Sequence, residues 1–154
     1  MAMATINPAT GETEFEAELH TPAEVETRIA LAQTAHETLR AMSYAERAAL
    51  MIKAADLIES EVEQTAVMLT REMGKPIAQS RGEVLKCAKS MRFYAEKAEE
   101  FLAPQVLADP SKVNASQAMA IWQPLGVVLA VMPWNYPLWQ VIRFAGPALM
   151  AGNS

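Results

Sequence analysis

The chain has 154 residues, of which 51% are hydrophobic and 20% are charged, and its formal net charge at pH 7 is −5. This balance is typical of a globular domain and excludes an intrinsically disordered chain. The acidic balance and the dispersed lysines and arginines argue against a nucleic-acid partner. The longest apolar run, residues 127–132, is too short to span a bilayer, and no signal peptide opens the sequence. With a single cysteine, Cys87, and hence no internal disulfide, we expect a cytoplasmic protein without a membrane partner.

Two short strands and a series of helices are expected in the first half of the chain. Residues 5–12 indicate a strand that ends in an Asn-Pro turn, and residues 15–19 indicate the returning strand. Three capping-box patterns, at residues 21–24, 43–46 and 60–63, each precede apolar residues at helical spacing. They predict three successive helices.

A longer helix and then strands are expected in the second half. Gly74 should end the third helix, and a fourth should run from Pro76 to just before Pro104, with apolar residues at helical spacing between them. Beyond it, residues 116–123 have strand character. The β-branched and apolar run at residues 127–132 is typical of a strand covered on both faces.

Residues 138–151 predict a last helix, bent near Pro147. A buried strand, a loop and a helix make the first half of a βαβ unit, so the predicted fold class is α/β with the start of a parallel sheet.

The titratable residues form no strong catalytic motif. We find no glycine-rich phosphate loop, no Cys/His metal cluster and no paired carboxylates, so no metal site is expected. His20 and His36 are expected at the surface or in structural roles. Cys87 is expected to pack as a small residue on a helix face, although the lysines beside it could lower the pKa of its thiol.

The most informative segment is the loop that contains Asn135, between the expected strand and the last helix. In open α/β sheets ligands bind at the carboxyl ends of strands. The side-chain amide of an asparagine can donate a hydrogen bond to a developing oxyanion without changing protonation. The same residue could instead cap the helix or order the turn.

Several motifs in the chain occur together in one known superfamily. They are Asn-Pro-Ala-Thr-Gly-Glu at 7–12, Glu-Met-Gly-Lys-Pro at 72–76, Pro-Leu-Gly-Val at 124–127, Pro-Trp-Asn-Tyr-Pro at 133–137 and Pro-Ala-Leu-Met-Ala-Gly-Asn at 147–153. In this order and spacing they resemble the aldehyde dehydrogenase superfamily over essentially the whole chain. Residues 85–96 and 138–144 are most similar to the bacterial succinate-semialdehyde dehydrogenases.

The resemblance implies the N-terminal part of an aldehyde dehydrogenase fold. Residues 1–112 would be the helical N-terminal part of the cofactor-binding domain. Residues 113–129 would form a β-arm that joins subunits, so a homo-oligomer is expected. Residues 130–154 would form the first strand, loop and helix of the parallel cofactor-binding core.

The resemblance also implies a reaction, the oxidation of an aldehyde, succinic semialdehyde by the subfamily, with NAD or NADP. In this family a cysteine thiolate attacks the aldehyde, hydride passes to the nicotinamide, and a glutamate-activated water hydrolyses the thioester. Asn135 matches the family asparagine of the oxyanion hole. Met132, Pro133 and Trp134 match the loop that borders the cofactor.

Arg143 matches an arginine in the substrate channel of succinate-semialdehyde dehydrogenases. Helical spacing places Tyr136 and Gln140 on the same side as Arg143, and we include both among the expected substrate-binding residues. The alternative for Arg143 is a solvated helix residue.

The family nucleophile and general base lie beyond Ser154 by resemblance, and Cys87 does not match that nucleophile. The 154-residue chain alone is therefore expected to be inactive. Two alternatives to a succinate-semialdehyde dehydrogenase segment remain. The chain could belong to an aldehyde dehydrogenase subfamily that acts on uncharged aldehydes, or it could be a non-catalytic module that docks on full-length subunits. The sequence does not distinguish NAD from NADP.

Overall fold

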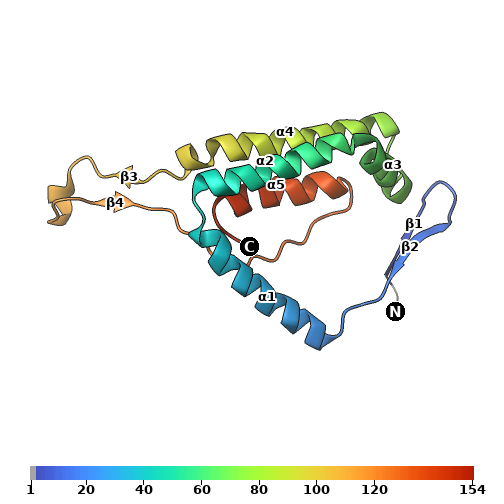
Figure 1. The fold of residues 1–154 in the computed structure, drawn as a ribbon, viewed down its shortest axis with the longest axis horizontal. Coiled ribbons are helices and arrows are strands. Elements are labelled where there is room, and N and C mark those ends of the chain that lie inside the picture. Colours follow the sequence, from blue (N-terminus) through green and yellow to red (C-terminus); the bar gives the residue numbers. More distant parts are fainter. Residues whose placement is uncertain (1–2) are drawn as a thin grey trace.

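The computed structural model describes residues 3–154, which form a group of packed helices flanked by two β-hairpins (Figure 1). Helices α2, α4 and α5 lie side by side, α3 packs at one end of α4, and α1 leads away from this group (Figure 1). The helices are α1 (Pro22–Ala41), α2 (Tyr44–Ser60), α3 (Val62–Met73), α4 (Ile77–Phe101) and α5 (Pro137–Met150). No helix in residues 3–154 is long and apolar enough to cross a membrane.

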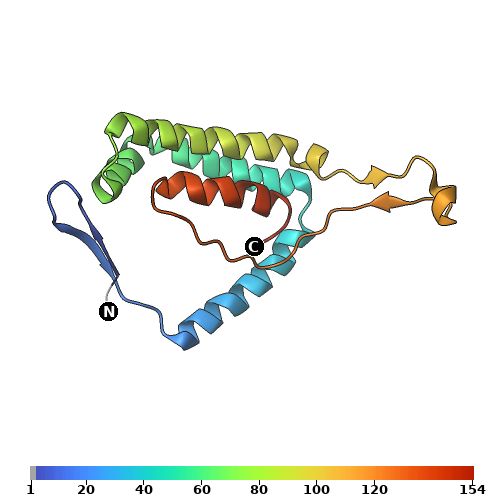
Figure 2. The same ribbon diagram turned by 180° about the vertical axis from the view of Figure 1, so that it is seen from behind.

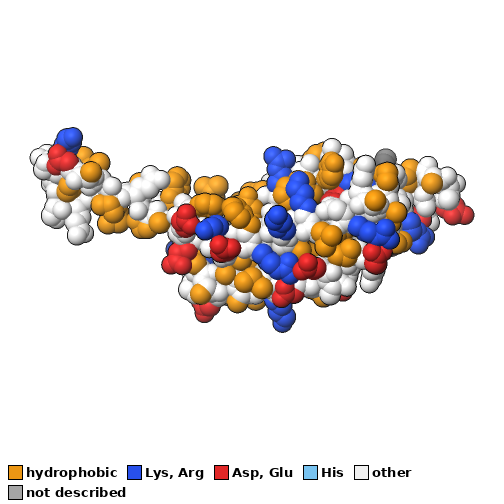
Figure 3. Space-filling model, turned by 90° about the horizontal axis from the view of Figure 1, so that it is seen from above, with side chains coloured by type: hydrophobic (Ala, Val, Ile, Leu, Met, Phe, Trp, Pro, Cys, Tyr) orange, Lys and Arg blue, Asp and Glu red, His pale blue; other side chains and the backbone are white. Residues whose placement is uncertain are grey.

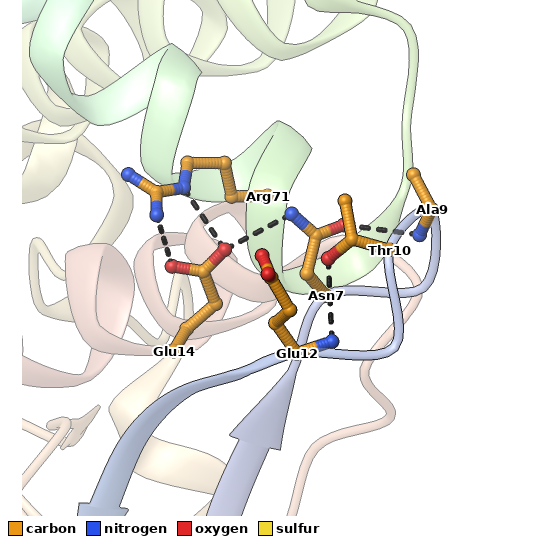
Figure 4. A network of polar contacts seen from close by, with 6 residues as sticks. All are labelled: Asn7, Ala9, Thr10, Glu12, Glu14 and Arg71. Atoms are coloured by element: carbon orange, nitrogen blue, oxygen red, sulfur yellow. Dashed lines mark hydrogen bonds and ion pairs between the residues drawn. The ribbon is translucent and has the colours of Figure 1, made fainter.

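The first hairpin confirms the two strands expected at the start of the chain. Strands β1 (Met3–Ile6) and β2 (Thr13–Ala17) pair antiparallel. Glu14, on β2, accepts hydrogen bonds from the side chains of Asn7, at 2.9 Å, and of Arg71 on α3, at 3.0 Å (Figure 4). The Arg71 and Asn7 hydrogen bonds lower the pKa of Glu14. These contacts tie the hairpin to the helices.

Two of the three predicted capping boxes are confirmed, and the third is wrong. Thr21 and Ser43 each accept from the backbone three residues on, where a glutamate bonds back to the cap. The expected third cap, Ser60, is instead the last residue of α2, and its hydroxyl donates to the Leu57 carbonyl at 2.8 Å. Because Ser60 is already helical, it cannot adopt the extended backbone of an N-cap, and α3 begins after Glu61 without a side-chain cap.

The core lies between α4 and its neighbours, and α4 supplies more of its buried residues than any other helix. The buried side chains of α4 include Val84, Ala88, Met91 and Ala98 of the predicted stripe, and Cys87 is buried beside them. Small residues let the helices approach closely. A Cβ atom added to Gly146 of α5 would lie 3.0 Å from the Tyr94 ring of α4. The burial of Cys87 within this core confirms its expected packing role on a helix face.

The second hairpin projects away from the helices as a narrow arm (Figures 1 and 3). Its strands, β3 (Gln105–Val106) and β4 (Met119–Ala120), pair antiparallel, and a 3-10 helix, η1 (Pro110–Val113), lies near its tip. The expected strand at residues 116–123 is thus formed only at 119–120. The paired arm also begins earlier in the chain than the expected residues 113–129.

No strand forms over residues 127–132 within the described part of the chain, contrary to the sequence prediction. One residue, Ser154, lies beside this segment. Its backbone N–H donates to the Gly126 carbonyl at 3.1 Å, and its carbonyl accepts from the Val128 N–H at 2.8 Å. These two bonds have the pattern of neighbouring parallel strands. The expected strand lacks a ladder because a single residue cannot provide one.

Asn153 fixes the segment before this run to the end of α5. Its side-chain oxygen accepts from the backbone N–H of Leu125, at 2.7 Å, and of Gly126, at 3.3 Å. Its side-chain nitrogen donates to the Ala148 carbonyl at 3.1 Å. The Pro-Leu-Gly-Val and Gly-Asn motifs are therefore in contact, although they lie far apart in the sequence.

Gly74 ends α3 in the left-handed conformation, with φ of +80°, as the sequence predicts. A Cβ atom there would lie 2.7 Å from Cγ of Pro8, so the Asn-Pro turn of the hairpin packs directly on this glycine. By contrast, Gly82 is a solvent-exposed residue within α4, away from its ends, and an added Cβ would meet no atom within 4 Å.

We predict opposite effects for alanine at these two glycines. Gly74→Ala should lower the free energy of unfolding by about 1–2 kcal/mol, because of the left-handed backbone, with a further loss from the Pro8 contact. Gly82→Ala should raise it by about 0.5–1 kcal/mol, because alanine loses less backbone entropy in a helix. Urea unfolding followed by circular dichroism measures both. Equal changes at the two positions would contradict the packing of Pro8 on Gly74.

Candidate active-site loop

The loop of residues 133–136 leads directly into the N-terminus of α5. The segment from β4 to α5 leaves the arm, runs past α5 and turns back into it (Figure 2). Pro137 is the first helical residue, where proline is favoured because its missing N–H would have no helical partner. Tyr136 is the N-cap residue and its side chain makes no capping hydrogen bond. Asn135 precedes the cap and is exposed.

The N-terminus of α5 is capped from another helix. Oε1 of Glu83, on α4, accepts from the backbone N–H of Leu138 at 3.1 Å and of Trp139 at 2.9 Å. These are the second and third residues of α5, the donors that an N-cap side chain normally satisfies. The negative charge also lies at the positive end of the helix dipole. The helix-cap alternative for Asn135 therefore finds no support, because Glu83 satisfies these amides.

The other carboxylate oxygen of Glu83 pairs with the ammonium group of Lys75, which follows Gly74. The two side chains are 3% and 1% exposed, for Lys75 and Glu83 respectively, so this ion pair is shielded from water. The same ammonium lies 3.7 Å from the ring centroid of Tyr136, a cation–π contact. Lys75 and Glu83 therefore join the end of α3, the start of α4 and the loop.

Sequence analysis missed both residues. Lys75 lies in the motif at residues 72–76 and Glu83 lies in the helix expected from Pro76, but the sequence analysis assigns neither a role. A signal for Glu83 exists, since it lies at helical spacing among buried residues of α4, four positions before Cys87. A carboxylate on a buried helix face requires partners, and that requirement could have marked it.

The loop residues expected to border a cofactor are accessible. Met132 is 37% exposed and Trp134 is 56% exposed. Trp134 lines a hollow together with strand β1 and Phe15 of the hairpin. The structure thus presents two apolar side chains beside Pro133 at the surface.

The residues expected to bind substrate lie on or beside α5. Arg143 is exposed, and within residues 3–154 it forms no ion pair. Gln140 is half-buried, one turn closer to the loop, and Tyr136 is exposed at the N-cap. Arg143 is six residues after Pro137, which corresponds to roughly 9 Å along the helix axis.

Comparison with known proteins identifies the family. The model of the aldehyde dehydrogenase family matches residues 1–154, the whole chain. The chain belongs to the aldehyde dehydrogenase family. This result confirms the resemblance of the motifs, and structural similarity confirms the expected N-terminal part of the fold.

Individual relatives agree with this assignment. An aldehyde dehydrogenase of Paenarthrobacter nicotinovorans is 52% identical over 154 residues, which are 100% of this chain and 34% of the relative. The NADP(+) succinate-semialdehyde dehydrogenase 1 of Mycobacterium tuberculosis is 54% identical over 99% of this chain and 33% of its own. A succinic semialdehyde dehydrogenase from Streptococcus pyogenes, solved in complex with NADP+, superposes with a TM-score of 0.90 and 31% identity, over 97% of this chain and 32% of its own. The chain thus spans about a third of the length of the relatives it matches.

Cys87 of this aldehyde dehydrogenase segment is not an activated thiol. Burial raises the pKa of the Cys87 thiol to about 12, and the charge of Glu83 acts in the same direction. The charge of Lys86 lowers the pKa, as the sequence suggests for an adjacent lysine, and so does the charge of Lys75, but desolvation is the larger effect. Cys87 therefore remains a protonated core residue at neutral pH.

We predict that Cys87 does not react in the folded protein. At pH 8, iodoacetamide should leave the peptide containing Cys87 unmodified, because the thiol is buried and its pKa lies far above the pH. The same peptide should be alkylated rapidly in denaturing urea. Peptide mass spectrometry measures both. Alkylation of the native protein at the rate of a free cysteine would show that the thiol is accessible.

Proposed function

We propose that the full-length protein oxidises succinic semialdehyde to the carboxylic acid, with NAD or NADP as hydride acceptor. The observation that carries this proposal is the exposed Asn135 amide, in a loop that is anchored by other residues and does not need Asn135 as a cap. The names of the M. tuberculosis and S. pyogenes relatives support the substrate and the NADP option.

Asn135 is proposed to donate its side-chain N–H to the aldehyde oxygen as negative charge develops there. An amide donor keeps the same protonation at any working pH, and a loop held in place reorganises little during the reaction. The cysteine thiolate that attacks the aldehyde is proposed to come from the remainder of the protein, since Cys87 is buried and protonated.

The first test replaces Asn135 in the full-length enzyme. Asn135→Ala should lower kcat by about 10²–10³-fold, equivalent to roughly 2.7–4 kcal/mol, the usual effect of losing one oxyanion donor. Steady-state kinetics measures kcat, and cofactor affinity should change little.

A second variant at this position separates the two roles considered for Asn135. Asn135→Asp keeps the size but removes the donor, so kcat should fall at least as far as in the alanine variant. An aspartate at a helix N-terminus is a good cap, so the capping role predicts unchanged stability and unchanged kcat. Activity retained in Asn135→Asp would therefore contradict the oxyanion role.

Met132, Pro133 and Trp134 are proposed to border the nicotinamide cofactor. The accessible apolar side chains of Met132 and Trp134 fit a group with a flat aromatic ring. The chemistry supplied by the bound cofactor is acceptance of the hydride. In this segment, the loop would position the ring and exclude water from one side of it.

Arg143 is proposed to bind the distal carboxylate of the substrate, with Gln140 and Tyr136 beside it. Cα–Cβ bonds in a helix tilt toward its N-terminus, so the Cα–Cβ bond of Arg143 is inclined toward the end of α5 that carries the Asn135 loop. A guanidinium can hold a carboxylate through two parallel hydrogen bonds and stays charged at every working pH. Arg143 has no competing ion pair within residues 3–154.

The second test is substrate selectivity. Arg143→Ala in the full-length enzyme should lower kcat/KM for succinic semialdehyde by about ten- to a hundredfold, corresponding to the 1.5–3 kcal/mol of a charge-assisted contact. The value for butyraldehyde, which ends in a methyl group, should change little. Arg143→Lys should restore only part of the loss, because an ammonium lacks the planar fork. Equal losses on both aldehydes would indicate a structural arginine.

The arm is proposed to join subunits in a homo-oligomer. The support is its projection from the helices and the exposure of Val106, Ile121 and Trp122 along it (Figure 3). We propose the domain division that the sequence predicts, in which residues 113–129 form the arm between residues 1–112 and 130–154. Strand β3, at residues 105–106, pairs with β4 of this arm and is proposed to take part in the same contact.

A further inference from the structure

Glu83 holds the N-terminus of α5 although it belongs to α4, and Asn135 lies only a few residues before that N-terminus. We infer that Glu83 is a positioning residue, which fixes the Asn135 amide by capping α5 and is itself oriented by Lys75. This inference rests on the proposed role of Asn135. Glu83 touches neither substrate nor cofactor in this arrangement and acts through the loop.

The position of α5 depends on this cap because no local residue replaces it. Pro137 has no N–H, and the side chain of the N-cap residue Tyr136 makes no capping hydrogen bond. The N–H groups of Leu138 and Trp139 lie in a partly buried region and both bond to Glu83. Without Glu83, these donors would need new partners, and the helix end would shift or fray to find them.

Lys75 sets the orientation of the carboxylate. Its ammonium takes one oxygen of Glu83, and the other oxygen is thereby directed at α5. The Lys75 ammonium also contacts the Tyr136 ring, so the same cation holds both the cap and the residue next to Asn135. Lys75 is in turn placed by Gly74, which packs on Pro8. These contacts together orient the carboxylate toward α5.

The chain between the cap and Asn135 is stiff. Proline fixes its own φ near −65° and disfavours the helical conformation for the residue before it. Tyr136, before Pro137, has φ of −142° and ψ of 75°. Because two residues of limited freedom separate Leu138 from Asn135, a displacement of the helix end is transmitted to the Asn135 amide.

The test compares two double variants of the full-length enzyme that both lack the ion pair. Lys75→Met with Glu83→Gln keeps an oxygen acceptor for the α5 amides, whereas Lys75→Met with Glu83→Met has similar size but no acceptor. The methionine variant should have a kcat lower than that of the glutamine variant by roughly 10- to 100-fold, as expected when a catalytic group is displaced by about 1 Å. The KM values for aldehyde and cofactor should be similar in the two variants. Equal kcat values would overturn the inference.

A double-mutant cycle tests whether the effect passes through Asn135. Asn135→Ala is added to both the glutamine and the methionine double variants. If Glu83 acts through Asn135, the cap has little left to position, and the ratio of the two kcat values should fall below about threefold, since the effects of coupled residues are not additive. An undiminished difference would overturn the inference. An Asn135→Ala variant with unchanged kcat would instead remove the proposed role of Asn135, so the two failures are distinguishable.

A third variant covers the outcome in which the methionine variant does not fold. Glu83→Asp with Lys75 retained keeps the negative charge beside the ammonium but shortens the side chain by one methylene, so it cannot reach both amides. It should lower kcat with little change in KM, and hydrogen exchange at the first turn of α5 should become faster. Normal kcat in a folded Glu83→Asp variant would also overturn the inference.

Discussion

The buried ion pair of Lys75 and Glu83 is the interaction on which the arrangement of this chain depends. Removing two charges from water is costly, and the mutual attraction of the pair offsets that cost only if the remaining hydrogen-bonding capacity is also satisfied. Here the carboxylate meets an ammonium, two backbone N–H groups and the positive end of a helix dipole. Each partner comes from a different part of the chain, so the pair is stable only when α3, α4 and α5 are assembled.

The N-terminal hairpin extends this assembly outward. Pro8 packs on Gly74, the residue before Lys75, and Glu14 of β2 pairs with Arg71 of α3 (Figure 4). The surface pair with Arg71 is solvent-accessible and contributes little by itself. The Pro8 contact has no such screening, because it depends on shape and on a left-handed glycine. The family motifs at residues 7–12 and 72–76 are therefore two sides of one contact.

Much of the helical structure could be predicted because local rules decide it. The caps at Thr21 and Ser43 and the left-handed Gly74 depend on a few neighbouring residues and form as expected. The cap expected at Ser60 fails because α2 continues through it, which is a tertiary outcome. The strand expected at residues 127–132 depends on partners that only Ser154 supplies here. In the candidate site, the motif predicts the Asn135 loop, but the cap by Glu83 is a contact across 55 positions that no local pattern contains.

Both ends of α5 are held by side chains that ordinary helix-capping rules do not anticipate. Glu83 binds its first turn, and Asn153 binds Ala148 near its last turn together with the segment around Gly126. Between these ends, Gly146 allows close packing on Tyr94 of α4. Glu83 and the close packing at Gly146 thus hold α5 against α4, and Asn153 holds its last turn against the segment around Gly126. The Asn135 loop therefore takes its position from the contact that Glu83 of α4 makes with the first turn of α5.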